Sequence, residues 1–212
     1  MDSRPAHAKL IRYPGLTLLV AAYNEQDTIV GTIESIALQE YPGPLEVIVV
    51  NDGSKDRTAE LVREQMPKYP WLRLLDLKQN VGKANALNEA LKLVSHTLTA
   101  TVDADSWLFR DALTGIVERY FQDPKNTRAV AGAVMVRNSR ASWMTRAQEW
   151  DYFHGISAIK RGWSAVDRPE QRYYAGPCYT EMPDPERPDE DVLCGYVLWA
   201  RLDQRVITCP GC

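Results

Sequence analysis

The stretch "LTLLVAAYNEQDTIVGTIESIALQE", residues 16–40, contains three kinds of sequence in succession. Residues 16–22 form a short, uninterrupted apolar run, which is typical of a strand that is buried on both faces. The polar residues "YNEQD" follow, and apolar residues then return with helical spacing at Ile29, Ile33 and Ile36. The stretch therefore predicts a buried strand, a polar loop and an amphipathic helix.

The same succession recurs along the next ninety or so residues, with polar or Gly/Pro-containing segments between the elements. Strands are predicted at residues 45–54, 71–77, 97–106 and 128–138. Helices are predicted at residues 56–66, 82–94 and 110–122.

Strands that alternate with helices of about ten to fifteen residues predict an α/β fold, in which a mostly parallel sheet carries helices on both faces. In such sheets, ligands bind beyond the carboxyl ends of the strands. The polar clusters "YNE", "NDGS" and "DADS" each follow a predicted strand. We therefore expect these clusters to meet at one edge of the sheet and to form the functional site.

The amino-acid composition and the hydrophobic periodicity of the sequence change after residue 162. Residues 167–188 hold five of the 13 prolines and show no clear period. Before that point, the aromatic-rich residues 142–161 indicate an amphipathic helix. Beyond it, residues 189–202 indicate one more helix and residues 205–209 a last strand. We therefore predict a core domain at residues 1–162 and an atypical segment at residues 163–212.

Charge and composition restrict the classes of partner and compartment. The formal net charge is −3, which argues against nucleic acid as a general partner. No run approaches the roughly 20 apolar residues of a membrane span, and the first residues lack the apolar core of a signal peptide. All cysteines lie near the carboxyl terminus, which fits a reducing compartment and predicts a cytoplasmic protein. They are Cys178, Cys194, Cys209 and Cys212.

Asp103 and Asp105 stand one residue apart at the end of a predicted strand. Residues i and i+2 of an extended chain point to the same side, so both carboxylates can face one ligand. Mg²⁺ and Mn²⁺ prefer such oxygen ligands, although an acidic turn in solvent is the alternative interpretation. Lys83 stands at a predicted helix start beside Gly82, where a cation suits a phosphate, unless it is simply a solvated lysine.

Four ordered motifs, "VAAYNE", "VIVVNDGSKDRT", "NVGKANALNEAL" and "TVDADS", resemble those of the family 2 inverting glycosyltransferases with the GT-A fold. The segment from "AVAGAVMVRN" to "QEWDYFHGISAIKR" is similar to the processive β-glycan synthases of that family, which make poly-N-acetylglucosamine, chitin, hyaluronan and cellulose. The resemblance covers roughly residues 14–161. It implies inverting transfer from a UDP-sugar donor to a glycan acceptor, with Mg²⁺ or Mn²⁺ as cofactor.

The resemblance also implies a role for each matching position. Asp52 would recognise the uracil, Lys83 would lie near the donor, and Asp105 would bind the metal that bridges the diphosphate. Asp103 would face the nucleotide and sugar and share in metal binding. The loop that contacts the nucleotide would contain Ala22, Tyr23 and Glu25. Residues 1–162 would then be the nucleotide-sugar-binding core.

An inverting transferase needs a general base for the acceptor hydroxyl. The family places this base in a Thr/Gly-Glu-Asp motif, for which "PDEDVL" offers Glu190 and Asp191. The Gln-x-x-Arg-Trp motif and the membrane helices of the processive members are absent, so a truncated chain is expected, with membrane association only through the missing segments. A catalytically incomplete UDP-sugar-binding fragment and a nucleotidyltransferase are the alternatives.

Overall fold

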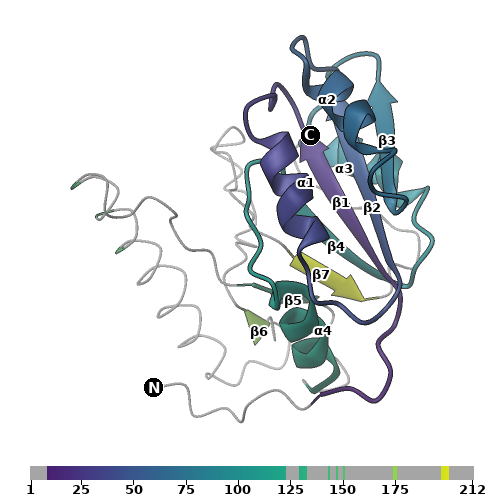
Figure 1. Cartoon of the computed structure of the whole chain (residues 1–212), viewed down its shortest axis with the longest axis vertical. Helices are drawn as coiled ribbons and strands as arrows, with labels where there is room; N and C mark the ends of the chain where they lie inside the picture. The colour runs from purple at the N-terminus through teal and green to yellow at the C-terminus, as the bar shows by residue number, and fades with distance from the viewer. Residues whose placement is uncertain are drawn as a thin grey trace, which may run out of the picture.

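The structure is a computed structural model that describes residues 9–122, 129–132, 174–175 and 197–200 and positions 143, 147 and 150. Within these residues seven strands form one sheet in the order β3-β2-β1-β4-β7-β5-β6 (Figure 1). The strands are β1 (Leu16–Ala22), β2 (Leu45–Asp52), β3 (Leu72–Leu77), β4 (Leu98–Asp103), β5 (Ala129–Ala131), β6 (Tyr174–Ala175) and β7 (Val197–Ala200). The helices are α1 (Ile29–Ala37), α2 (Thr58–Gln65), α3 (Lys83–Leu91) and α4 (Ala112–Gln122).

Strands β3, β2, β1 and β4 are parallel, as the alternation of strands and helices predicts. The chain proceeds outward from β1 to β2 and β3, and it then crosses back to place β4 on the other side of β1. The strand order therefore reverses between β1 and β4. In sheets of this kind, the ligand crevice lies beyond the carboxyl ends of the strands at the point of reversal. The arrowheads of β1 and β3 mark that end at the top of Figure 1.

Both faces of the central strands β1 and β2 are covered, which explains why their sequences are mostly apolar without alternation. Leu16, Leu18 and Val20 of β1 belong to one buried cluster together with side chains of α1, α2 and α4. Leu19, between them, belongs to a second cluster with side chains of α3. Figure 1 shows α1 in front of the sheet and α3 behind it. The predicted arrangement of helices on both faces is confirmed.

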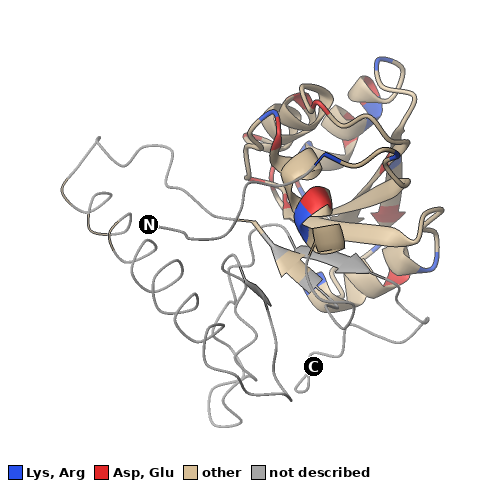
Figure 2. Cartoon of the chain, turned by 90° about the horizontal axis from the view of Figure 1, so that it is seen from below, with Lys and Arg blue, Asp and Glu red and all other residues tan. Residues whose placement is uncertain are grey.

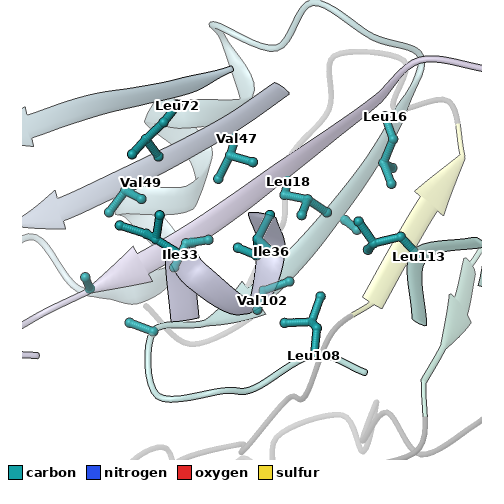
Figure 3. Close-up of a cluster of buried hydrophobic side chains, with 14 of the residues drawn as sticks. Leu16, Leu18, Ile33, Ile36, Val47, Val49, Leu72, Val102, Leu108 and Leu113 are labelled. Carbon is teal, nitrogen blue, oxygen red and sulfur yellow. The ribbon is translucent and has the colours of Figure 1, made fainter. Parts of the chain in front are cut away.

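Helix α1 is anchored by the spacing seen in the sequence. Ile29, Ile33 and Ile36 are at most 1% exposed and lie on one helix face. Figure 3 shows Ile33 and Ile36 among the side chains of Leu18 and Val49. Burying one such side chain contributes roughly 1.5–3 kcal/mol. This packing holds the loop before α1 at the carboxyl end of β1.

Several predicted elements differ in the structure. The strands expected at residues 45–54 and 97–106 end earlier, at Asp52 and Asp103. The strand expected at residues 128–138 is a strand at Ala129–Ala131, and residue 132 lies outside it. The prediction of a helix at residues 189–202 is wrong for Val197–Ala200. These residues form β7, which is antiparallel to both β4 and β5. A short apolar run such as "VLWA" fits a helix or a strand equally well by its period. Pairing with two neighbouring strands decides in favour of the strand.

The remaining predicted elements lie largely outside the described residues. In the segment 142–161, positions 143, 147 and 150 are described and are helical. The strand expected at residues 205–209 and all cysteines fall outside the described residues. The division of the chain at residue 162 therefore stays a prediction.

Two general properties of the described part bear on its partners. None of its helices is long and apolar enough to cross a membrane. Figure 2 shows acidic and basic residues interspersed over the described ribbon, as the small net charge leads one to expect. The described surface thus has no single dominant charge, and the binding properties of the sheet edge depend on the individual side chains there.

Candidate functional site

The loops that follow β1 and β2 are joined by hydrogen bonds at the carboxyl end of the sheet. The Asn24 N–H donates to Ser54 Oγ (2.9 Å), and Asn24 Oδ1 accepts from the Lys55 N–H (2.9 Å). The Glu25 N–H donates to Thr58 Oγ1 (2.8 Å). Asn24 has a φ of +57°, in the left-handed region that Asn tolerates better than most residues. The two loops therefore form one unit.

Asp52, at the end of β2, fixes a third loop. Its side chain is buried, with 3% exposure of the residue. Oδ1 accepts from the Val81 N–H (2.7 Å) and Oδ2 from the Gly82 N–H (3.0 Å). Hydrogen bonds from backbone N–H groups to a carboxylate are charge-assisted and strong. Asp52 thus holds the backbone from which α3 begins.

A close backbone contact supports the same loop. Gly53 has a φ of +68°, and a Cβ at this position would lie 2.4 Å from the Gln79 carbonyl carbon and 2.5 Å from the Asn80 nitrogen. Only glycine allows both this conformation and this approach. The glycine of the "NDGS" motif is therefore required by the meeting of two loops.

Lys83 and Asp103 are brought together by this arrangement. Lys83 is the first residue of α3, and its Nζ donates to Asp103 Oδ1 at 2.6 Å. The Lys83 side chain is 50% exposed, whereas that of Asp103 is 18% exposed. Two residues that the sequence analysis selected separately therefore form one ion pair, at the end of the strand beside β1.

The electrostatics of Asp103 reflect its burial and its neighbours. Burial raises the pKa of the Asp103 carboxyl, the Lys83 ammonium lowers it and the charge of Asp105 raises it again, so that the pKa lies above its ordinary value. The two carboxylates are thus close enough to repel each other. Asp105 itself is exposed. The end of β4 is therefore a centre of negative charge that only partly finds compensation in Lys83.

This donor set fits a divalent cation that is shared with a substrate. Mg²⁺ in proteins is usually held by one or two carboxylates, and substrate phosphates and water complete its shell. Asp103 supplies one carboxylate at the end of β4, and Asp105 supplies a second from the turn that follows it, not from an extended chain as expected. No group of three or more His, Cys, Asp or Glu side chains suited to a metal exists among the described residues. Among the described residues an ion would therefore find only these two carboxylates, and substrate phosphates and water could complete its shell.

The predicted nucleotide-contacting loop lies beside this centre. Ala22 ends β1 and is buried, and its neighbour Ala21 pairs in register with Asp103. Tyr23 follows and is 42% exposed, so its ring is accessible to a ligand. Glu25 Oε2 accepts from Thr28 Oγ1 (2.7 Å), which ties the loop to the start of α1.

Asp56, which the sequence suggests as the cap of a helix, makes a further contact in the structure. The Asp56 carboxylate accepts from the N–H groups of Thr58 (3.0 Å) and Gln26 (3.1 Å). With Asn24 and Ser54, it joins the first two loops. An acid two residues before a threonine at a helix start is a local signal for such a turn. The predicted acceptor-side residues Glu190 and Asp191 lie outside the described residues, so their roles stay predictions.

Comparison with known proteins tests the resemblance. The family model described as "Glycosyl transferase family 2" matches residues 17–176. The poly-beta-1,6-N-acetyl-D-glucosamine synthase of Staphylococcus epidermidis is 38% identical over 150 residues, which are 71% of this chain and 35% of that protein. The enzyme of the same name from Staphylococcus aureus strain MSSA476 is 38% identical over 147 residues, 69% of this chain and 35% of that protein. The chain thus spans 35% of the length of these relatives.

Similar solved structures support the predicted fold. The mannosyltransferase PcManGT from Pyrobaculum calidifontis, in complex with GDP-Man and Mn²⁺, superposes with a TM-score of 0.56 and 31% identity, over 65% of this chain and 39% of that one. TarS 1-349 of S. aureus, with a TM-score of 0.50 and 24% identity over 59% of this chain and 37% of that one, shares the fold. The α/β fold of the GT-A type is thereby confirmed, and the chain belongs to glycosyl transferase family 2.

Proposed function

We propose that this chain binds a UDP-sugar through a divalent metal at Asp103 and Asp105, and that it transfers the sugar to a glycan acceptor with inversion. The observation that carries the proposal is the pair of carboxylates at the end of β4, beside the reversal of strand order and joined to Lys83. Family membership favours glycosyl transfer over the nucleotidyl transfer that the sequence left open.

The charges at this site suit a nucleoside diphosphate. Carboxylates alone repel a diphosphate, whereas a divalent cation held between them can bind both. When bound, Mg²⁺ or Mn²⁺ would act as a Lewis acid that neutralises the charge on the departing diphosphate. Lys83, at the amino end of α3, would supply a further positive charge close to the phosphates.

The nucleoside would lie toward β1 and β2. Exposed Tyr23 offers an aromatic ring on the loop that follows β1, and Ala22 and Glu25 belong to the same loop. An ionised carboxylate has about four lone-pair sites, and Asp52 uses two of them for backbone N–H groups. The remaining capacity supports the proposal that Asp52 also accepts from the uracil.

The donor sugar is proposed to be N-acetylglucosamine. The support is the identity of 38% to synthases named for poly-beta-1,6-N-acetyl-D-glucosamine. GDP-mannose is the competing donor, because the similar archaeal mannosyltransferase was solved with GDP-Man. On the acceptor side, Asp191 is proposed as general base with Glu190 beside it. The distribution of cysteines supports a reaction on the cytoplasmic side.

The experiment is a donor panel. The protein is incubated with Mn²⁺, a β-1,6-linked glucosamine oligomer and, in turn, UDP-N-acetylglucosamine, UDP-glucose and GDP-mannose, and released nucleotide and extended oligomer are measured. We expect release from UDP-N-acetylglucosamine, its loss in Asp105→Asn and its retention in the control Asp111→Asn, an exposed acid before α4. Release from GDP-mannose alone would overturn the proposed donor. UDP binding without any release would support the catalytically incomplete fragment.

The proposed base has its own variant. Asp191→Asn should abolish extension of the oligomer, because loss of a general base typically costs about 10²–10⁴ in rate. It should leave UDP binding within about twofold, since the base acts on the acceptor hydroxyl and not on the nucleotide. Extension at the wild-type rate would remove Asp191 from the proposal while leaving the donor site intact.

A further inference from the structure

The ammonium of Lys83 pairs with one oxygen of a carboxylate to which the proposed metal would bind. Its Nζ lies 2.6 Å from Asp103 Oδ1, and Asp103 is the more buried partner of the pair. A divalent cation at the two carboxylates has to share Asp103 with this positive charge or displace it. The ion pair is therefore a competitor for the metal within the chain itself.

The starting point of the Lys83 side chain is fixed, whereas its end is not. The preceding N–H groups of Val81 and Gly82 are held by Asp52, and the Gly82 carbonyl accepts from the Ala86 N–H in the first turn of α3. The side chain beyond is half exposed and has a flexible four-carbon stem. The ammonium can therefore leave Asp103 for another anion without movement of the backbone.

The arrival of a diphosphate changes the balance of charges. Unit charges 4 Å apart interact strongly enough to alter an equilibrium constant several-fold even at the screening of bulk water. Lys83 must therefore weaken binding of a metal ion alone. A diphosphate at the same place offers the ammonium a second anion and offers the metal further oxygen ligands. By linkage, each of the two ligands then strengthens binding of the other to the same degree.

We propose that Lys83 couples metal binding to donor binding, because it holds Asp103 until the diphosphate of the nucleotide draws its ammonium away. This inference rests on the proposed function and deepens it. Lys83 is a positioning residue in this account, since it acts through Asp103 as well as on the phosphates. A lysine that contacted only the phosphates and lay away from Asp103 would leave the affinity for the metal alone unchanged.

The test measures Mn²⁺ binding by the electron paramagnetic resonance of the free ion, first without nucleotide and then with saturating UDP. Wild type is compared with Lys83→Met, Lys83→Arg and the control Lys92→Met. Lys92 lies just beyond the other end of α3, pairs with Glu89 at 2.7 Å and is 66% exposed, so its loss removes an ion pair that does not involve Asp103. Circular dichroism confirms that each variant is folded.

We expect Lys83→Met to bind Mn²⁺ alone at least about fivefold more tightly than wild type, because an opposing charge is gone. UDP should then strengthen Mn²⁺ binding by a smaller factor than in wild type. Lys83→Arg and Lys92→Met should behave as wild type. Binding of Mn²⁺ alone that is no tighter in Lys83→Met would overturn the inference while leaving the metal site in place. Failure of wild type to bind Mn²⁺ even with UDP would overturn the proposed function, and this inference with it.

Discussion

The two ends of the parallel sheet each carry a largely buried acid. The two acids differ in the number of hydrogen-bond donors around them. Glu46, near the amino end of β2, accepts from Arg73 Nη1 (2.7 Å), Thr17 Oγ1 (2.9 Å) and the N–H and Oγ of Ser95 (both 3.0 Å). Asp103, at the carboxyl end of β4, accepts from Lys83 and lies close to the like charge of Asp105.

The pKa values shift in opposite directions as a result. Burial raises the pKa of Glu46, but the hydrogen bonds from Arg73, Ser95 and Thr17 outweigh it, and the pKa lies below its ordinary value. Burial also raises the pKa of Asp103, and there the single ammonium does not outweigh it. The amino end of the sheet is built for stability, whereas the carboxyl end retains charge that a ligand can compensate.

The largest loss of stability should follow removal of Glu46, the acid whose hydrogen bonds are all made within the chain. Glu46→Ala removes the acceptor for three residues and should lower the free energy of unfolding by about 2–3 kcal/mol, since Arg73 keeps its access to water. Urea denaturation measures this. Glu64→Ala, which breaks an exposed pair with Arg57, should cost less than about 1 kcal/mol. An equal loss of unfolding free energy in the two variants would mean that the hydrogen bonds of Glu46 add no special stability at the amino end of the sheet.

Asp52 lies at the carboxyl end of the sheet, but like Glu46 it is held by more than one hydrogen bond and should contribute to stability. Asp52→Asn leaves one acceptor oxygen for two N–H groups and turns an NH₂ group toward one of them, so it should cost about 1–2 kcal/mol. Hydrogen exchange at Val81 and Gly82 should become faster than in wild type. Unchanged exchange at both amides would mean that Asp52 does not hold the loop before α3.

Asp103→Asn should be neutral or slightly stabilising at neutral pH, by less than about 1 kcal/mol. The reason is that the folded chain disfavours the ionised form of Asp103, which the raised pKa expresses. Thermal denaturation at pH 7 compares the variant with wild type. A marked loss of stability would show that the pair with Lys83 is structural, and the contrast with Glu46 would then disappear.

The pH dependence of these variants should have opposite signs. A lowered pKa in the folded state means that Glu46 adds stability above its ordinary pKa of 4.5 and loses it as the pH falls through the lower folded value. The cost of Glu46→Gln should therefore shrink at low pH. For Asp103 the pKa is raised, so ionisation above 3.8 removes stability, and the advantage of Asp103→Asn should grow as the pH rises. Parallel trends in the two unfolding series would contradict the account.

The sequence predicted the fold wherever a pattern is local. The apolar runs before "YNE", "NDGS" and "DADS" lie in β1, β2 and β4, and helical spacing placed α1 within the predicted range. Strand β7 was missed because its pairing with β4 and β5 decides its conformation, and neighbours in space leave no period in the sequence.

The position of the polar clusters was predictable from the sequence, whereas the contacts between their residues were not. Each polar cluster was placed at the correct edge, because the carboxyl ends of parallel strands meet there. The pairing of Lys83 with Asp103 depends on the return of the chain across β1, and the anchoring of Val81 and Gly82 by Asp52 depends on the packing of two loops. Such long-range contacts follow from the sheet order, which the sequence pattern does not determine.

The central claim is that the carboxylates at the end of β4 bind a nucleotide diphosphate through a metal. Calorimetric titration of UDP into the protein, with Mn²⁺ and then with EDTA, tests it most directly. We predict that EDTA or Asp105→Asn weakens UDP binding at least about tenfold, which is ~1.4 kcal/mol, while Asp111→Asn has no effect. Equal affinity for UDP with Mn²⁺ and with EDTA would contradict the claim.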